Sequence, residues 1–190
     1  MRLAVLASGT GSILSAILEK GIAVDLVVVD RDCRAEKLAA DAGVMTVRIE
    51  RQSYRADFDR AAYTDAVRKR LANHAIDVVA MAGFGTILGA SFFDDFHHRV
   101  LNTHPALLPS FPGWHGVRDA LAAGVKVSGC SVHIATPVVD AGPILAQAAV
   151  DVFEDDTESS LHERIKAVER KLYPETLAAF IHDLEHERTN

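Results

Sequence analysis

The residues best suited to catalysis are an amide and an imidazole two positions apart, Asn102 and His104, in the segment LNTHPALLPSFPG. They follow a short apolar run that we expect to be a strand, and alternation along a strand places both side chains on one face. An asparagine amide can donate a hydrogen bond to a developing oxyanion, and an imidazole can carry a proton near neutral pH. The pair favours a catalytic site at the end of a strand, although an isolated N-x-H also fits a capped loop with a structural histidine.

A carboxylate, Asp140, lies in the turn VVDAGP. Aspartate is common in turns because its side chain hydrogen-bonds the local backbone, and that alone would explain the residue. Beside His104 it would instead orient the imidazole and favour the protonated ring. Together with Asn102 and His104, Asp140 forms a candidate unit for acyl transfer.

The first apolar run ends in the loop SGTGS, residues 8–12, ahead of a helical pattern. Backbone amides at the start of a helix suit a phosphate. The loop lacks the lysine of a P-loop, and Leu14 stands where the third glycine of the dinucleotide motif would fall. Phosphate binding and a simple tight turn with Ser12 as N-cap both remain open.

The composition narrows the ligand classes. The chain of 190 residues carries 20 Lys and Arg against 26 Asp and Glu, a net charge of −6 that attracts neither nucleic acid nor an anionic membrane. The two cysteines, Cys33 and Cys130, have no metal-site spacing, so we expect no metal. The opening apolar run is too short for a signal peptide or a membrane span, which favours a cytoplasmic protein acting on small molecules.

Short apolar runs alternate with helical patterns in the first half of the chain, which is typical of parallel strands joined by crossover helices. The expected strands are 3–7, 24–30, 45–49 and 77–83, and the expected helices are 13–19, 34–42 and 57–73. A fifth strand at 99–102 precedes a proline-rich loop at 103–115, and two extended segments, 127–135 and 144–153, precede a helical pattern over 159–184. We expect Pro174 to kink or split that helix and the tail after Leu184 to fray.

These elements predict an α/β fold with a Rossmann-like open, mostly parallel sheet, helices on both faces and one late antiparallel strand. We expect a single domain over 1–190, with a phosphate-binding half at about 1–100 and a catalytic half at about 101–190. Among the remaining histidines, His97 and His98 are expected at the surface, His115 in support of the long loop, and His133 packed inside a strand.

The segment LNTHPALLPSFPG, followed by GCSVHIATPVVDAGPILAQ, resembles the formyltransferase family that uses 10-formyltetrahydrofolate. The resemblance implies that Asn102, His104 and Asp140 are catalytic. It implies transfer of a formyl group from 10-formyltetrahydrofolate, a cosubstrate, to the amine of phosphoribosylglycinamide in purine biosynthesis, without a metal. Pairing with a second copy of the chain is left open.

The resemblance also assigns the two substrates. The residues expected to bind the ribose phosphate and glycinamide are Gly9, Thr10, Gly11, Ser12, Ile13, Pro105 and Glu169. Those expected to bind the folate, with Asn102 and Asp140, are Arg60, Phe84, Gly85, Thr86, Ile87, Leu88, Val100, Thr136, Val138 and Val139. Three positions depart from the family: Ile13 replaces a frequent asparagine, and Gly85 and Thr86 stand where a bulky and then a basic residue are common, which predicts a more open, less charged folate pocket.

Several other functions stay open. Hydrolysis of the same folate, formyl transfer to another amine, and a non-catalytic nucleotide- or folate-binding module all fit the fold. A nicotinamide-dependent dehydrogenase, with Asp30 as ribose partner, is disfavoured because Leu14 breaks the glycine motif.

Overall fold

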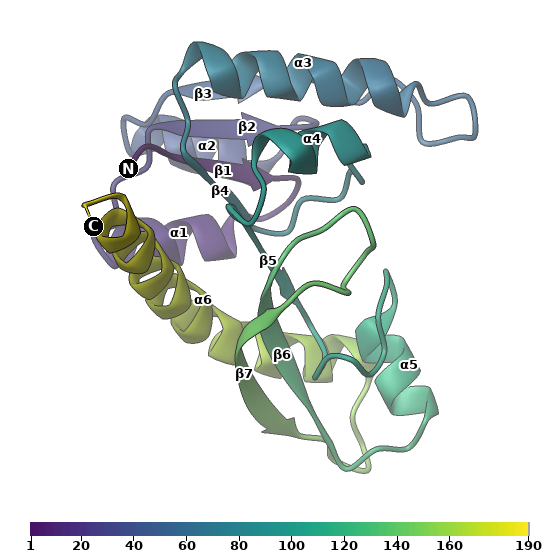
Figure 1. Ribbon diagram of the computed structural model, residues 1–190. Coiled ribbons are helices and arrows are strands. Elements are labelled where there is room, and N and C mark those ends of the chain that lie inside the picture. Colours follow the sequence, from purple (N-terminus) through teal and green to yellow (C-terminus); the bar gives the residue numbers. More distant parts are fainter. Residues whose placement is uncertain (190) are drawn as a thin grey trace.

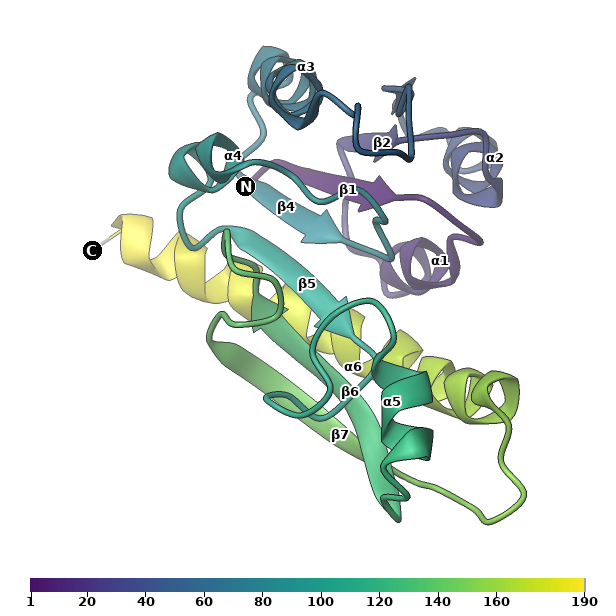
Figure 2. The same cartoon turned by 90° about the vertical axis from the view of Figure 1, so that its right-hand side faces the viewer.

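The computed structural model describes residues 1–189 and contains one seven-stranded sheet in the order β3-β2-β1-β4-β5-β6-β7. Strands β1 to β5 are parallel, β6 is antiparallel to β5, and β7 is antiparallel to β6. The strands are β1 (Leu3–Ala7), β2 (Leu26–Val29), β3 (Thr46–Arg48), β4 (Val78–Met81), β5 (Val100–His104), β6 (Val127–Ile134) and β7 (Ile144–Asp151). Figure 1 and Figure 2 show the sheet from two directions. The predicted mostly parallel sheet with one antiparallel strand is confirmed.

Helices cover both faces of the sheet because its central strands are apolar on both sides. The helices are α1 (Ser12–Glu19), α2 (Arg34–Asp41), α3 (Arg60–Asn73), α4 (Ala90–Asp95), α5 (Gly116–Ala122) and α6 (Glu158–Thr189). Side chains of α1, α2 and α6 share one apolar core with the sheet, and those of α3 and α4 share a second core on the other face. A third cluster joins α5 and α6 to β6 and β7, and Figure 2 shows α6 running along the back of these strands.

Helix α6 differs from the sequence prediction at its end. Pro174 lies inside the helix, which does not split, and its axis changes direction along its length in Figure 1, in agreement with the predicted kink. The segment after Leu184 remains helical instead of fraying. The Met1 amino group lies 2.5 Å from Glu185, and Arg188 lies 3.1 Å from Asp77, so ion pairs tie this part of the helix to the start of the sheet.

The strand order places the site. The chain leaves β1 for β2 on one side and later returns to β4 on the other, so the loops after β1 and β4 separate at the carboxyl edge of the sheet. In open α/β sheets, ligands bind in the crevice that this reversal creates. The loop at 8–12 and the predicted folate segment at 84–88 follow these two strands.

Tyr173 provides a test of how α6 is held on the sheet. Its side chain is fully buried, and its hydroxyl donates a hydrogen bond to the Leu101 carbonyl at 3.1 Å. Tyr173→Phe leaves that buried carbonyl without this donor. We therefore expect the free energy of unfolding, measured in urea, to be about 1–3 kcal/mol lower than that of the wild type. The exposed Tyr54→Phe serves as control, with a change within about 0.5 kcal/mol. Equal stability of the two variants would contradict this role of the hydroxyl.

Candidate active site

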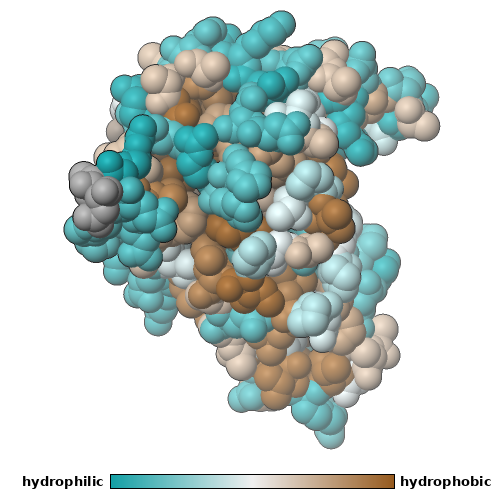
Figure 3. All heavy atoms as spheres, in the orientation of Figure 1, coloured by the Kyte–Doolittle hydropathy of each residue, from teal (hydrophilic) through white to brown (hydrophobic). Residues whose placement is uncertain are grey.

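A cavity of about 720 Å³ lies at the carboxyl ends of β1, β4 and β5. It is walled by the loop after β1, the segment after β4, the end of β5, the turn between β6 and β7, and one side of α6. Figure 3 shows a largely hydrophilic surface over α3, with hydrophobic atoms gathered in the middle of the same face. The cavity brings together segments that are far apart in the sequence, as expected for a switch-point site.

The glycine loop forms one end of the cavity. Gly11 has a left-handed φ of +76°, and a Cβ there would lie 2.9 Å from Cα of Ala35, so glycine is required at this position. Gly11, not Ser12, is the N-cap of α1, and it has no side chain to occupy the first amides. The interpretation of Ser12 as N-cap is therefore wrong. Ile13 lines the cavity and is 5% exposed, and its hydrocarbon side chain has no hydrogen-bond donor.

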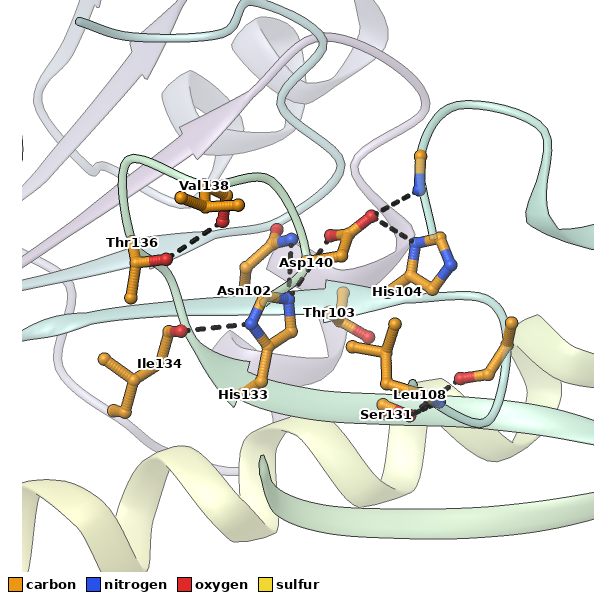
Figure 4. A network of polar contacts seen from close by, with 12 residues as sticks. Asn102, Thr103, His104, Leu108, Ser131, His133, Ile134, Thr136, Val138 and Asp140 are labelled. Carbon is orange, nitrogen blue, oxygen red and sulfur yellow. Dashed lines mark hydrogen bonds and ion pairs between the residues drawn. The ribbon is translucent and has the colours of Figure 1, made fainter. Parts of the chain in front are cut away.

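The three predicted catalytic residues all line the cavity, and Figure 4 shows them close to one another. Nδ1 of His104 is 3.2 Å from Oδ2 of Asp140, and Nε2 of His104 is 2.7 Å from the carbonyl oxygen of Phe111. A carbonyl and an ionised carboxylate both accept hydrogen bonds only, so these two partners match an imidazole ring that carries both protons. The surroundings of His104 therefore suit the imidazolium.

His133 joins the same network, although the sequence indicated only a packed histidine. It is 1% exposed, and its Nε2 lies 3.2 Å from Nδ2 of Asn102 and 3.5 Å from Oδ1 of Asp140. Its Nδ1 lies 3.1 Å from the carbonyl oxygen of Ile134. Alternation along β6 predicts the face on which the His133 side chain lies. It cannot show that Asn102 of β5 is paired directly with His133 in the sheet. His133 thus lies between the amide of Asn102 and the carboxylate of Asp140.

Asp140 is held in its ionised form by its partners. Burial acts to raise its pKa, but hydrogen bonds from His133 and the Gly113 amide, with the charge of His104, outweigh burial and lower the pKa below its ordinary value. The Gly113 amide donates to Oδ2 at 2.7 Å. Asp140 has a φ of +55°, uncommon for a residue with a side chain, in the turn that aims the carboxylate at His104.

Glu169 enters the cavity from α6. It is 7% exposed, and the Thr103 hydroxyl donates to its Oε1 at 2.6 Å. Burial raises the pKa of Glu169, although the Thr103 hydrogen bond and the charges of Lys166 and Arg170 act in the opposite direction. His162 and Lys166 lie on the same side of α6 and also line the cavity. The sequence analysis does not single them out. The signal that identifies them is helical spacing, because Lys166 follows His162 by four residues and Glu169 follows Lys166 by three.

The predicted folate residues are only partly gathered at the cavity. The segment from Phe84 to Leu88 and the turn residues Thr136 and Val139 line it, as does Pro105 on the acceptor side. Three residues do not line it: Arg60 begins α3, Val100 is fully buried in the β5 core, and Val138 is 66% exposed, with its carbonyl accepting from Thr136.

Two further features bear on the class of protein. Across residues 1–189, no cluster of three or more His, Cys, Asp or Glu side chains has the arrangement of a metal site. Within the same span, no helix is both long enough and apolar enough to cross a bilayer.

A Rossmann-like sheet with an Asn–His–Asp constellation at its switch point is the arrangement that the resemblance implied, and the chain belongs to the formyl transferase family. The model of that family, described as "Formyl transferase", matches residues 1–177.

Particular relatives narrow the comparison. The chain is 50% identical over 186 residues to phosphoribosylglycinamide formyltransferase of Mycobacterium tuberculosis, covering 94% of this chain and 84% of the relative. It is 33% identical to the protein of that name from Bacillus subtilis, covering 93% and 92%. Among solved structures, glycinamide ribonucleotide transformylase 1 from Symbiobacterium toebii superposes with a TM-score of 0.90 at 39% identity, covering 96% of this chain and 88% of that one.

Glu169 makes the stability of the protein depend on pH. Because its pKa is raised on folding, the folded protein binds more protons than the unfolded chain, and the free energy of unfolding falls as pH rises from about 4.5 through the raised value. Glu169→Gln removes this contribution, so we expect a variant that is more stable than the wild type at neutral pH.

Urea unfolding at a series of values between about pH 5 and pH 8 measures this difference. The exposed Glu175→Gln is the control, for which the dependence on pH should match that of the wild type. A Glu169→Gln profile parallel to the wild-type profile would show that burial of Glu169 does not affect stability.

Proposed function

We propose that this chain transfers the formyl group of 10-formyltetrahydrofolate to the amine of 5′-phosphoribosylglycinamide, a step of purine biosynthesis. The observation that carries the proposal is the meeting of Asn102, His104 and Asp140 in a cavity that also contains the glycine loop. The relatives named above support it, because two proteins that carry the name of this activity are matched over 84% and 92% of their length.

The proposed chemistry needs stabilisation of an oxyanion and the exchange of one proton at each nitrogen. The acceptor amine forms a bond to the formyl carbon, and the carbonyl electrons move to oxygen, where the Asn102 amide and the His104 imidazolium stabilise the charge. The carbonyl then re-forms as the bond to N10 of the folate breaks. The amine loses one proton and N10 gains one, so a turnover releases no net proton. His104, held by Asp140, is therefore in the same protonation state at the end of each turnover as at the start.

The subsites follow from the walls of the cavity. The phosphate is proposed to lie on the amides of Gly11 and Ser12 at the start of α1. Lys166 lines the same cavity and supplies a positive charge that compensates for the missing side-chain donor at Ile13. Glu169 is proposed to accept a hydrogen bond from the glycinamide, and the segment from Phe84 to Leu88 is proposed to hold the folate.

The wider setting is also a proposal. We propose that residues 1–190 act as one formyltransferase domain in the cytoplasm, on small molecules and without nucleic acid, a membrane or a metal. Pairing with a second copy is proposed through β7, because this strand lies at the edge of the sheet and exposes Ile144 and Leu145.

The direct test mixes the purified protein with 10-formyltetrahydrofolate, with and without phosphoribosylglycinamide. Deformylated folate is followed by absorbance and the formylated product by mass spectrometry. We expect both to appear only when the amine is present. Folate turnover without the amine would favour a hydrolase, and no turnover in either mixture would favour another acceptor or a binding module.

Asn102 provides the sharpest test of the oxyanion role. Asn102→Ala removes a donor to the developing charge, so we expect kcat to fall by roughly 10²- to 10³-fold with the fold unchanged. Steady-state kinetics and a thermal melt measure the two effects. Asn73→Ala, on the exposed end of α3, is the matched control. A near-normal kcat for Asn102→Ala would remove Asn102 from the proposed mechanism.

A further inference from the structure

Gly85 lies at the cavity wall where two long side chains from other segments converge. A Cβ built on Gly85 would lie 3.3 Å from Cη2 of Trp114 and 3.3 Å from Nη2 of Arg31. The indole comes from the loop after β5, and the guanidinium comes from the end of β2. The missing side chain at Gly85 therefore does not make this part of the cavity wide open. The indole of Trp114 and the guanidinium of Arg31 occupy the space beside Gly85.

The backbone that carries Trp114 is fixed, although its indole is 78% exposed. The preceding residue, Gly113, donates its amide hydrogen to Asp140, and the Phe111 carbonyl accepts from His104. Both anchors are residues of the proposed catalytic group. An exposed indole on an anchored loop that lines the cavity is placed to contact a ligand.

Arg31 is held by a buried carboxylate. Its Nε and Nη2 donate to the two oxygens of Asp30, which has no exposed surface, and the Thr86 hydroxyl donates to the same carboxylate at 2.7 Å. The Gly85 amide in turn donates a hydrogen bond to the Ser8 hydroxyl at 2.7 Å, which connects the segment after β4 to the loop after β1. Asp30, which could have been the ribose partner of a dehydrogenase, is thus committed to orienting Arg31 and the segment after β4.

A second arginine extends this positive region. The guanidinium of Arg31 lies 5.0 Å from the centre of the Tyr54 ring, and that of Arg51 lies 4.6 Å from the same ring. Two cations on one exposed tyrosine repel each other, and the buried Asp30 balances only one of them. A carboxylate arriving from solvent would reduce this repulsion.

We propose that Trp114 and Arg31, with Arg51 beyond them, bind the benzoylglutamate half of the formyl donor, the ring against Trp114 and the glutamate carboxylates at the arginines. The inference rests on the proposed function. The formyl group of that donor lies between its pterin and its benzoyl ring. With the formyl group at Asn102 and His104 and the pterin among Phe84 to Leu88, the remaining half projects past Gly85 toward the exposed indole and the two guanidinium groups.

The experiment measures the Kd of two donors by calorimetry, without the acceptor and without oxygen: 10-formyltetrahydrofolate and 10-formyltetrahydropteroate, which lacks the glutamate. For the wild type we expect the loss of the glutamate to weaken binding about tenfold, as for a charge-assisted hydrogen bond. Arg31→Gln should weaken the full donor by a similar factor and leave binding of the pteroate within about twofold. Trp114→Ala should weaken both donors, and Trp114→Phe should restore most of the loss.

Matched variants separate this role from alternatives. Arg55→Gln, an exposed arginine in the loop before α3, should bind both donors like the wild type. Arg51→Gln leaves the pair of Arg31 with Asp30 intact, so it keeps the test valid if Arg31→Gln unfolds, and it should also lose binding only for the donor with glutamate. Arg60→Gln tests the rival position at the start of α3.

The outcomes are distinct. Equal loss for both donors in Arg31→Gln and Arg51→Gln, no loss in any Arg31, Arg51 or Trp114 variant, or a glutamate-dependent loss in Arg60→Gln alone would each overturn the inference. A wild-type protein that binds neither donor would overturn the proposed function, and the inference with it. A wild type that binds the donors but transfers no formyl group to the glycinamide would leave the subsite supported and the acceptor wrong.

Discussion

The arrangement of the cavity depends on the ionised carboxylate of Asp140 being buried and fully compensated. A buried charge without partners would be costly, and here an imidazole from β5, an imidazole from β6 and the amide of Gly113 converge on it. The three partners belong to three different segments. One carboxylate therefore connects β5, β6 and the long loop after β5. The positions of His104 and Trp114 both follow from this convergence.

Much of the fold was readable from the chain because it depends on local patterns. Buried apolar runs at β1, β2 and β4 predicted parallel strands, since only a strand covered on both faces is apolar throughout. The six-residue α4 and the seven-residue α5 were missed because helices so short show barely two turns of periodicity. The polar end of α6 predicts fraying, but ion pairs hold it, and these join residues far apart in the sequence.

The candidate site was readable only through its motifs. Asn102 and His104 share a face of one strand, so their proximity follows from alternation, whereas the approach of Asp140 depends on the sheet register and on a left-handed backbone conformation. The role of His133 requires knowing which residue lies opposite it on β5. Arg31 and Trp114 meet at Gly85 from two loops, and no spacing in the chain indicates that contact.

The covering of β5 and β6 by α6 has a consequence for how the protein is made. One face of these strands, including Leu101, Val132 and Ile134, packs in the core that Tyr173 and Leu177 complete. During synthesis the strands emerge from the ribosome before the helix, so this apolar sheet face is exposed to water while about forty further residues, from the end of β6 to Tyr173 and Leu177, are added. The interval is a period of exposure to aggregation, in which a chaperone that shields β5 and β6 would raise the yield of native protein.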